Sequence, residues 1–109
     1  KALAHITGGG LLENVPRVLP DHLACEIDAR KWSFPPVFAW LRKIAGTDPQ
    51  EMARTFNCGI GMALAVARED AAKVTEALSG AGEQVHSIGI IRARKDSEPG
   101  CSVLHTEAW

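Results

Sequence analysis

The sequence lacks any long apolar run and any excess of charge of one sign. No stretch approaches the roughly 18 consecutive apolar residues that a membrane-spanning helix needs, so we expect no membrane span. No basic segment followed by an apolar one stands at the start, and no secretory signal is predicted. The formal net charge is -1, from 12 basic and 13 acidic residues, which argues against a nucleic-acid-binding groove.

Cysteine is scarce, and Cys25, Cys58 and Cys101 lie far apart without a C-x-x-C pair. An odd number at such spacings argues against a disulfide framework and favours a reducing, cytoplasmic compartment. A zinc site would have to gather cysteines and histidines from across the fold, whereas structural zinc sites use local ligand pairs. We therefore expect no metal site and three small thiols, buried or half-buried.

What is present is the composition of one globular domain. Of the 109 residues, 46% are hydrophobic and 23% are charged. A chain of this size buries roughly 60 to 70% of its unfolded surface, which is enough for one core. The chain begins with Lys1 in place of Met and enters an apolar stretch at once, so we expect it to be a piece of a longer protein.

The first part of the chain predicts a strand, a tight turn and a helix. Residues 2–6 form a short apolar run that ends before a triple glycine, which is typical of a strand and turn. From Leu11 onward the apolar positions fall on one face of a helix. Because Pro16 removes a backbone donor inside this segment, we expect a short helix that is split near Val15 and stopped by Pro20.

The middle of the chain predicts one strand and two helices. Residues 25–31 are interpreted as an edge strand. An apolar stripe between Pro36 and Gly46 predicts a helix with proline in its first turn. The segment 48–51 (DPQE) is typical of a helix start, and the helix that follows should carry Met52, Ala53 and Phe56.

The second half predicts a buried strand, a helix and two closing strands. Residues 59–67 alternate between large apolar and small side chains, so we expect a central strand covered on both faces. Residues 68–70 begin a helix whose buried stripe should be Ala71, Val74 and Leu78. Segments 86–94 and 102–105 are interpreted as strands. The fold class is therefore α/β (α+β), a single mixed sheet with helices packed on it.

The turn Thr7-Gly8-Gly9-Gly10, between a strand and a helix, is the most informative local feature. Glycines let backbone N–H groups converge on an anion because no Cβ atom stands in the way. The turn has neither the Lys-Ser/Thr of a P-loop nor the G-x-G-x-x-G pattern of a dinucleotide site. A triple glycine is also common as a plain tight turn, and both interpretations stay open.

The neighbours of this turn include three polar side chains. His5 lies at the exit of the strand, where ligands bind in open α/β sheets. Asn14 and Arg17 lie one helical turn apart, and an arginine can bind phosphate oxygens through two hydrogen bonds. The alternative is structural: His5 is then a hydrogen-bonded core residue, Asn14 a cap and Arg17 part of a solvated face.

The segment Asn57-Cys58-Gly59-Ile60-Gly61 raises the same question. Gly59 and Gly61 on one face can admit a ligand or a partner chain beside Asn57, or can let a helix pack closely. We favour the packing interpretation. Cys58 has no local base and nothing that lowers its pKa, so we reject it as a nucleophile.

Two stretches carry a family resemblance: residues 2–20, ALAHITGGGLLENVPRVLP, and residues 51–62, EMARTFNCGIGM. Both closely resemble segments of the aminoimidazole ribonucleotide synthetases, also called phosphoribosylformylglycinamidine cyclo-ligases. Their order and spacing fit as well, and the similarity extends over essentially the whole chain.

The resemblance implies the C-terminal domain of a two-domain synthetase, incomplete because its opening strand and helix are absent. The first domain would carry most of the ATP-binding segments and the interface of a homodimer. The implied reaction is the ATP-dependent closure of the imidazole ring of formylglycinamidine ribonucleotide in purine biosynthesis. ATP and Mg²⁺ would be bound mainly by the first domain, and we expect neither on this chain.

The resemblance also implies roles for individual residues. The residues expected to hold a substrate phosphate or line the interdomain cleft are Gly8, Gly9, Gly10, Asn14 and Arg17. His5 and Thr7 would lie nearer the reacting end of the substrate. Two alternatives remain: a related synthetase, of the amidotransferase, selenophosphate or thiamine monophosphate kinase type, or a non-catalytic binding domain with a structural glycine loop.

Overall fold

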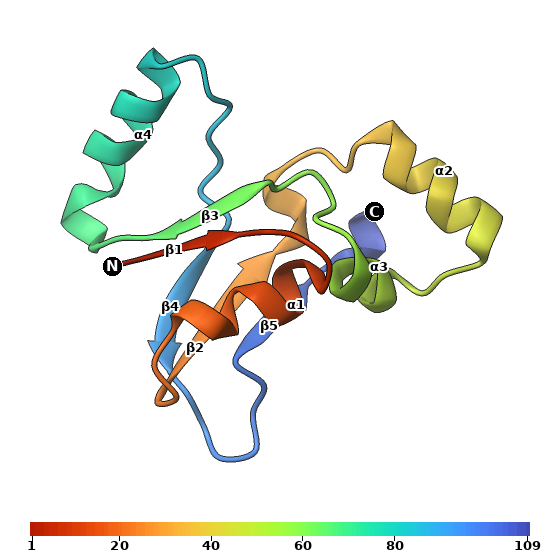
Figure 1. Ribbon diagram of the computed structural model, residues 1–109, viewed down its shortest axis with the longest axis horizontal. Coiled ribbons are helices and arrows are strands. Elements are labelled where there is room, and N and C mark those ends of the chain that lie inside the picture. Colours follow the sequence, from red (N-terminus) through yellow and green to blue (C-terminus); the bar gives the residue numbers. More distant parts are fainter.

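The computed structural model describes residues 1–109, and its strands form two small sheets (Figure 1). β1 (Ala2–His5) pairs antiparallel with β3 (Met62–Ala65). In the second sheet, β2 (Leu23–Asp28) lies between β4 (Gly89–Ala93) and β5 (Cys101–Leu104), antiparallel to β4 and parallel to β5. The α/β (α+β) class is confirmed, with the strands divided between two sheets in place of the single mixed sheet expected.

Four α-helices connect and flank these strands: α1 (Gly10–Asn14), α2 (Pro36–Ala45), α3 (Pro49–Thr55) and α4 (Ala71–Gly80). Four short 3-10 helices accompany them: η1 (Pro16–Val18), η2 (Ala29–Lys31), η3 (Arg68–Asp70) and η4 (Thr106–Ala108). None of the helices is both long and apolar enough to span a membrane.

Local sequence signals place the helix ends as predicted. The first helix is split at Val15, where α1 ends and η1 begins with Pro16. The carboxylate of Asp48 accepts a hydrogen bond of 2.7 Å from the backbone N–H of Gln50 and so caps α3. Gly46 ends α2 in the left-handed conformation, with φ +63°. These boundaries are confirmed because each rests on the chemistry of neighbouring residues.

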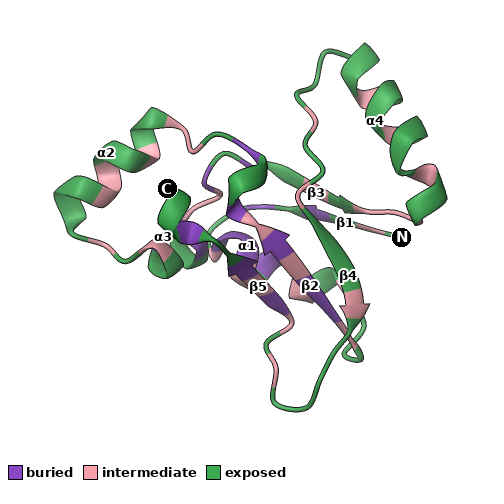
Figure 2. Cartoon of the chain, turned by 180° about the vertical axis from the view of Figure 1, so that it is seen from behind, coloured by how far each residue is buried: buried purple, intermediate pink, exposed green.

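The core lies where β1, α1 and α3 pack against the three-stranded sheet (Figure 2). Leu11, Ile27, Met52 and Cys58 are its largest fully buried side chains. Met52 and Ala53 lie on α3 as predicted and are buried, whereas Phe56 follows the last residue of α3 and is half-buried. One small core therefore supports the turn between β1 and α1.

Two strand predictions are wrong. The expected edge strand at residues 25–31 is β2, the middle strand of its sheet. The expected central strand at residues 59–67 is β3, which pairs only with β1. Its small side chains point inward while Met62 and Leu64 are exposed, so one of its faces is uncovered.

Two helices lie at the periphery, and their apolar stripes are largely uncovered (Figure 1). The buried stripe expected on α4 is wrong: Ala71 is exposed, and Val74 and Leu78 are only half-buried. On α2, Trp40 and Ile44 are 59% and 65% exposed. Each helix forms from local sequence signals, whereas burial of its apolar stripe requires a packing partner that the described residues do not supply.

Aromatic residues attach α2 to the rest of the molecule. The rings of Phe34 and Trp109 stack with centroids 4.8 Å apart, and Phe38 of α2 lies 5.8 Å from Phe56. Trp32, buried in the core, meets Trp109 edge-on at 5.9 Å. Such pairs contribute about 0.5–1.5 kcal/mol each beyond their burial. One edge of α2 is thereby fixed while its opposite face stays exposed.

The molecule exposes more surface than a monomer of its mass usually does. Its accessible surface is 6958 Å², whereas a monomeric protein of this mass exposes about 5,900 Å². Only 18 of the 109 residues are buried, which agrees with the uncovered faces of β3, α2 and α4.

Gly10 fixes how closely α1 approaches α3. A Cβ atom at Gly10 would lie 2.0 Å from the carbonyl oxygen of Ala53 and 2.6 Å from that of Phe56. Gly10 also has φ +59°, in the left-handed region that favours glycine. At Gly8, by contrast, a Cβ would meet no atom within 4 Å.

We predict that Gly10→Ala lowers the free energy of unfolding by about 2–4 kcal/mol, because the methyl group collides with backbone and the φ angle is unfavourable. Gly8→Ala, the matched control, should change it by less than about 1 kcal/mol. Urea unfolding of both variants measures the difference. Equal stability of the two variants would contradict this packing.

An ion-pair network holds the turn between β4 and β5. Arg92 donates hydrogen bonds to Glu26 at 3.1 Å and to both carboxylate oxygens of Glu98. The backbone N–H of Lys95 donates to Glu98 at 2.9 Å. Arg92, followed by this backbone hydrogen bond, lowers the pKa of Glu98 from 4.5 to about 2.

Because folding lowers the pKa of Glu98, its carboxylate stabilises the fold above about pH 4.5, and this contribution is lost as the pH falls toward 2. We predict that Glu98→Gln is less stable than the wild type at neutral pH. The difference in the free energy of unfolding between the two proteins should shrink when urea unfolding is repeated at decreasing pH. A difference that stays constant over that range would show that the charge of Glu98 is not responsible.

Candidate functional site

The candidate site is the glycine loop, residues 7–10, which connects β1 to α1 as predicted. Its three glycines differ in what surrounds them. Gly10 is buried against α3, and Gly9 has φ +100° with the side chain of Glu13 beside it. Gly8 is exposed, with open space where a side chain would be. Glycine is therefore needed at positions 9 and 10 for conformation or packing, whereas position 8 is open to solvent.

The backbone N–H groups of the loop are only partly used inside the chain. Gly10 donates a hydrogen bond of 3.0 Å to the carbonyl oxygen of Thr7. The N–H groups of Gly8 and Gly9 donate to no atom of the protein. Two amide donors on a glycine-rich turn thus remain available to an acceptor from solution.

The side chain of Asn14 supports the loop by hydrogen bonds to its backbone. Its side-chain amide donates to the carbonyl oxygens of Thr7 at 3.2 Å, Gly8 at 3.3 Å and Gly10 at 2.9 Å. Its Oδ1 atom accepts a hydrogen bond from the Thr7 hydroxyl at 3.3 Å. Asn14 is only 5% exposed, so its direct contribution is to the backbone of the loop.

Arg17 joins the same network from the outer side. Its guanidinium donates a hydrogen bond of 3.2 Å to Oδ1 of Asn14. The rest of the side chain is exposed, so further N–H groups are free to bind an anion. His5 is exposed at the end of β1, where its Cα pairs in register with Met62. The core-histidine alternative for His5 is therefore wrong. The structure brings Thr7, the glycines, Asn14 and Arg17 together by hydrogen bonds and does not join His5 to them.

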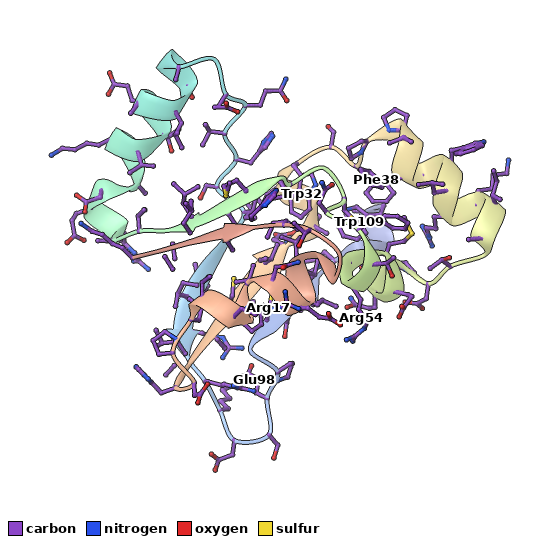
Figure 3. All side chains as sticks on the ribbon, viewed as in Figure 1. Arg17, Trp32, Phe38, Arg54, Glu98 and Trp109 are labelled. Carbon is purple, nitrogen blue, oxygen red and sulfur yellow. The ribbon has the colours of Figure 1, made fainter.

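Sequence reasoning did not identify two charged residues near the loop. Glu13 of α1 lies beside Gly9 and forms a loose ion pair of 3.9 Å with Arg54 of α3. Arg54 also lies 3.8 Å from Glu51, at the i,i+3 spacing that was the only sequence signal for it. Arg17 and Arg54 are both labelled in Figure 3; Arg54 offsets part of the negative charge of Glu13, whereas Arg17 contacts Asn14.

The segment Asn57–Gly61 forms a tight turn. Cys58 and Gly59 have φ +52° and +103°, and Ile60 donates to the carbonyl oxygen of Asn57 at 3.0 Å. The side chain of Asn57 accepts a hydrogen bond of 2.9 Å from the N–H of Gly59. Both bonds are internal to the turn and are typical of an Asx turn, which is a structural feature.

The two glycines of this turn have different surroundings. A Cβ on Gly59 would come within 2.8 Å of the ring of Pro35, so this glycine permits close packing. The packing element is a proline beside Trp32, in place of the helix we expected. Gly61 is exposed, with nothing within 4 Å of an added Cβ, and its carbonyl accepts a bond of 3.0 Å from Ile6.

All three cysteines are buried and free, as predicted for small core thiols. The Cys58 thiol donates to the carbonyl oxygen of Met52 at 3.3 Å. Burial raises the pKa of Cys58 from 9.0 to about 12, so almost no thiolate forms at neutral pH. This agrees with our rejection of Cys58 as a nucleophile.

A metal site and a surface hollow are the other kinds of site to compare with the glycine loop. No group of three or more His, Cys, Asp or Glu side chains lies close enough together to hold a metal ion. A surface hollow of about 700 Å³ lies beside the turn between β4 and β5, lined by polar residues that include His22, Arg94 and Glu98. This hollow includes no residue of the glycine loop, and its lining carries both signs of charge.

Comparison with known proteins connects this geometry to a family. Residues 1–102 match the family described as AIR synthase related protein, C-terminal domain. The chain is 55% identical over 98 residues to a phosphoribosylformylglycinamidine cyclo-ligase of Neisseria gonorrhoeae (strain ATCC 700825 / FA 1090). It is 53% identical over 98 residues to the protein of that name from Neisseria meningitidis serogroup C / serotype 2a. Each comparison covers 90% of this chain, which spans 28% of the length of these relatives.

We predict that Asn14→Ala lowers the free energy of unfolding by about 1–3 kcal/mol, because carbonyl groups of the loop lose their donor. The neighbouring exposed residue provides a control: Glu13→Ala should change it by no more than about 0.5 kcal/mol. Urea unfolding measures both. An Asn14→Ala variant as stable as its control would show that the carboxamide does not hold the loop.

Proposed function

Because this chain belongs to the AIR synthase related C-terminal domain family, we propose that it acts as the C-terminal domain of a phosphoribosylformylglycinamidine cyclo-ligase. In this reaction, ATP transfers its γ-phosphoryl group to the amide oxygen of formylglycinamidine ribonucleotide, and ADP leaves. The amidine nitrogen then attacks the activated carbon, the imidazole ring closes and phosphate departs. The observation that carries the proposal is the glycine loop, whose position and free amides suit a phosphate of the substrate.

On this proposal, the amides of Gly8 and Gly9 and the outer N–H groups of Arg17 bind the phosphate group of the ribonucleotide. Asn14 and Gly10 act through the loop: one holds its carbonyl groups and the other allows it to pack on α3. His5, just before the loop, and Thr7, its first residue, are exposed and are candidates for contacts nearer the reacting end of the substrate.

ATP and Mg²⁺ are assigned to the rest of the complete enzyme. Magnesium in phosphoryl-transfer sites is held by carboxylates together with phosphate oxygens. The carboxylate nearest the loop, Glu13, is an isolated side chain in a loose ion pair with Arg54, so these residues do not fit a magnesium site. No step of the proposal therefore runs through a metal on this chain.

The uncovered apolar surface supports a role within a larger protein. Leu3 on β1 and Met62 and Leu64 on β3 are exposed, and the total accessible surface exceeds the monomer expectation by roughly 1,000 Å². An excess of this size is comparable to one side of a stable interface, about 800 Å² per partner. We propose that the first domain covers part of this surface, in a homodimeric enzyme of the cytoplasm.

We predict that Arg17→Ala, in a full-length cyclo-ligase carrying this chain as its C-terminal domain, raises the KM for the ribonucleotide by about 10- to 100-fold. A charge-assisted hydrogen bond worth about 1.5–3 kcal/mol is lost. The turnover number should change little, because this contact binds substrate and transition state alike. Steady-state cyclisation kinetics measure both constants.

Lys73→Ala is the matched control. Lys73 is an exposed cation on α4, outside the glycine loop and its hydrogen-bond network, so its removal tests the effect of lost positive charge alone. Its KM should stay at the wild-type value. An unchanged KM in Arg17→Ala, or an equal rise in both variants, would overturn the proposed role of Arg17.

A further inference from the structure

Two of the three cysteines lie side by side in the three-stranded sheet. Cys25 of β2 and Cys101 of β5 are register partners in the parallel pair of strands. Neighbouring strands lie about 4.8 Å apart. This spacing falls within the Cα separation of about 4.4–6.8 Å that a disulfide bond spans. Register partners also project to the same face of a sheet, and both cysteines belong to the core.

The two thiols also interact with each other. Interaction with the Cys101 thiol lowers the pKa of Cys25, against the opposing effect of burial. The same interaction, together with burial, raises the pKa of Cys101. Cys25 is therefore the thiol of the pair that ionises first, and thiolate is the form that reacts with oxidants.

One member of the pair, Cys101, lies at the end of an edge strand, which provides a route of access. Cys101 is the first residue of β5 and follows the exposed turn after β4. The preceding residue, Gly100, accepts a hydrogen bond of 2.9 Å from the N–H of Cys25. We expect an oxidant to reach the pair through local opening of this strand end, because strand ends open at a lower free energy than the whole fold.

We propose that Cys25 and Cys101 form a redox modification site, which a peroxide converts into a disulfide bond between β2 and β5. The Cys25 thiolate attacks one peroxide oxygen, the O–O bond breaks, and Cys25 becomes a sulfenic acid. The Cys101 sulfur then displaces the sulfenic oxygen as water and forms the S–S bond. The two thiols together lose two electrons and two protons, and hydrogen peroxide is reduced to two molecules of water.

The third cysteine supplies an internal comparison. Cys58 lies at the turn after α3, outside both paired strands, and its thiol donates to the carbonyl oxygen of Met52. Burial raises the pKa of Cys58 to about 12, so it is the least reactive toward peroxide at neutral pH. Oxidation of the native protein should therefore leave Cys58 as a free thiol.

The experiment treats the native protein with hydrogen peroxide, quenches it, and counts free thiols by alkylation in denaturant. We expect the number to fall from three to one. The mass should fall by two hydrogens, and peptide mapping should find a Cys25–Cys101 disulfide that dithiothreitol reverses. Cys58→Ala should retain the same disulfide, and Cys101→Ala should form no intramolecular one.

Three results would overturn the proposal. The first is a disulfide that involves Cys58 in the native protein. The second is separate oxidation of Cys25 and Cys101 to sulfinic acids, and the third is three free thiols at peroxide concentrations that form disulfides in the urea-unfolded chain. Because the wild-type map alone decides among these, the test holds even if a cysteine variant fails to fold.

Discussion

The side-chain amide of Asn14 is the contact on which the candidate site depends. It is buried and binds the carbonyl oxygens of Thr7, Gly8 and Gly10, while its oxygen accepts hydrogen bonds from Thr7 and Arg17. This one side chain binds the carbonyl groups of the loop, while the N–H groups of Gly8 and Gly9 have no partner inside the protein. A buried carboxamide without these partners would destabilise the fold, so the loop and Asn14 depend on each other.

The site also depends on surfaces that this chain alone leaves uncovered. The glycine loop follows β1, which belongs to a two-stranded sheet with exposed apolar residues such as Leu3 and Leu64. Helices α2 and α4 likewise keep most of their surface exposed. An anion bound at the loop would lie at the edge of this uncovered region. The proposed role as one domain of a larger synthetase joins these two features, because the same partner would cover the apolar surface and complete the site.

The sequence predicted those parts of the fold that local chemistry determines. Pro16 splits the first helix, Gly46 ends α2 and Asp48 caps α3, and each of these effects arises within a few residues of its cause. Burial was harder to predict. An apolar stripe such as that of α4 indicates a helix equally well whether its partner is present or absent, and alternation alone cannot show which side of β3 is covered.

The same division applies to the candidate site. The triple glycine and its position between a strand and a helix could be predicted from the sequence. The family resemblance assigned Asn14 and Arg17 to the same site. That Asn14 supports the loop from within depends on how its side chain is oriented, which sequence spacing does not determine. That Arg54 lies near Glu13 depends on the contact between α1 and α3, which joins residues far apart in sequence and which no local pattern encodes.

Amide hydrogen exchange, followed by NMR in the ligand-free protein, shows whether the loop keeps free donors. We expect the Gly10 N–H, bonded to Thr7, to exchange slowly, whereas those of Gly8 and Gly9 should exchange nearly as fast as in an unfolded chain. Strong protection of Gly8 and Gly9 without a ligand would show that these donors are already satisfied inside the protein. The loop would then be a structural turn with nothing left to offer a phosphate.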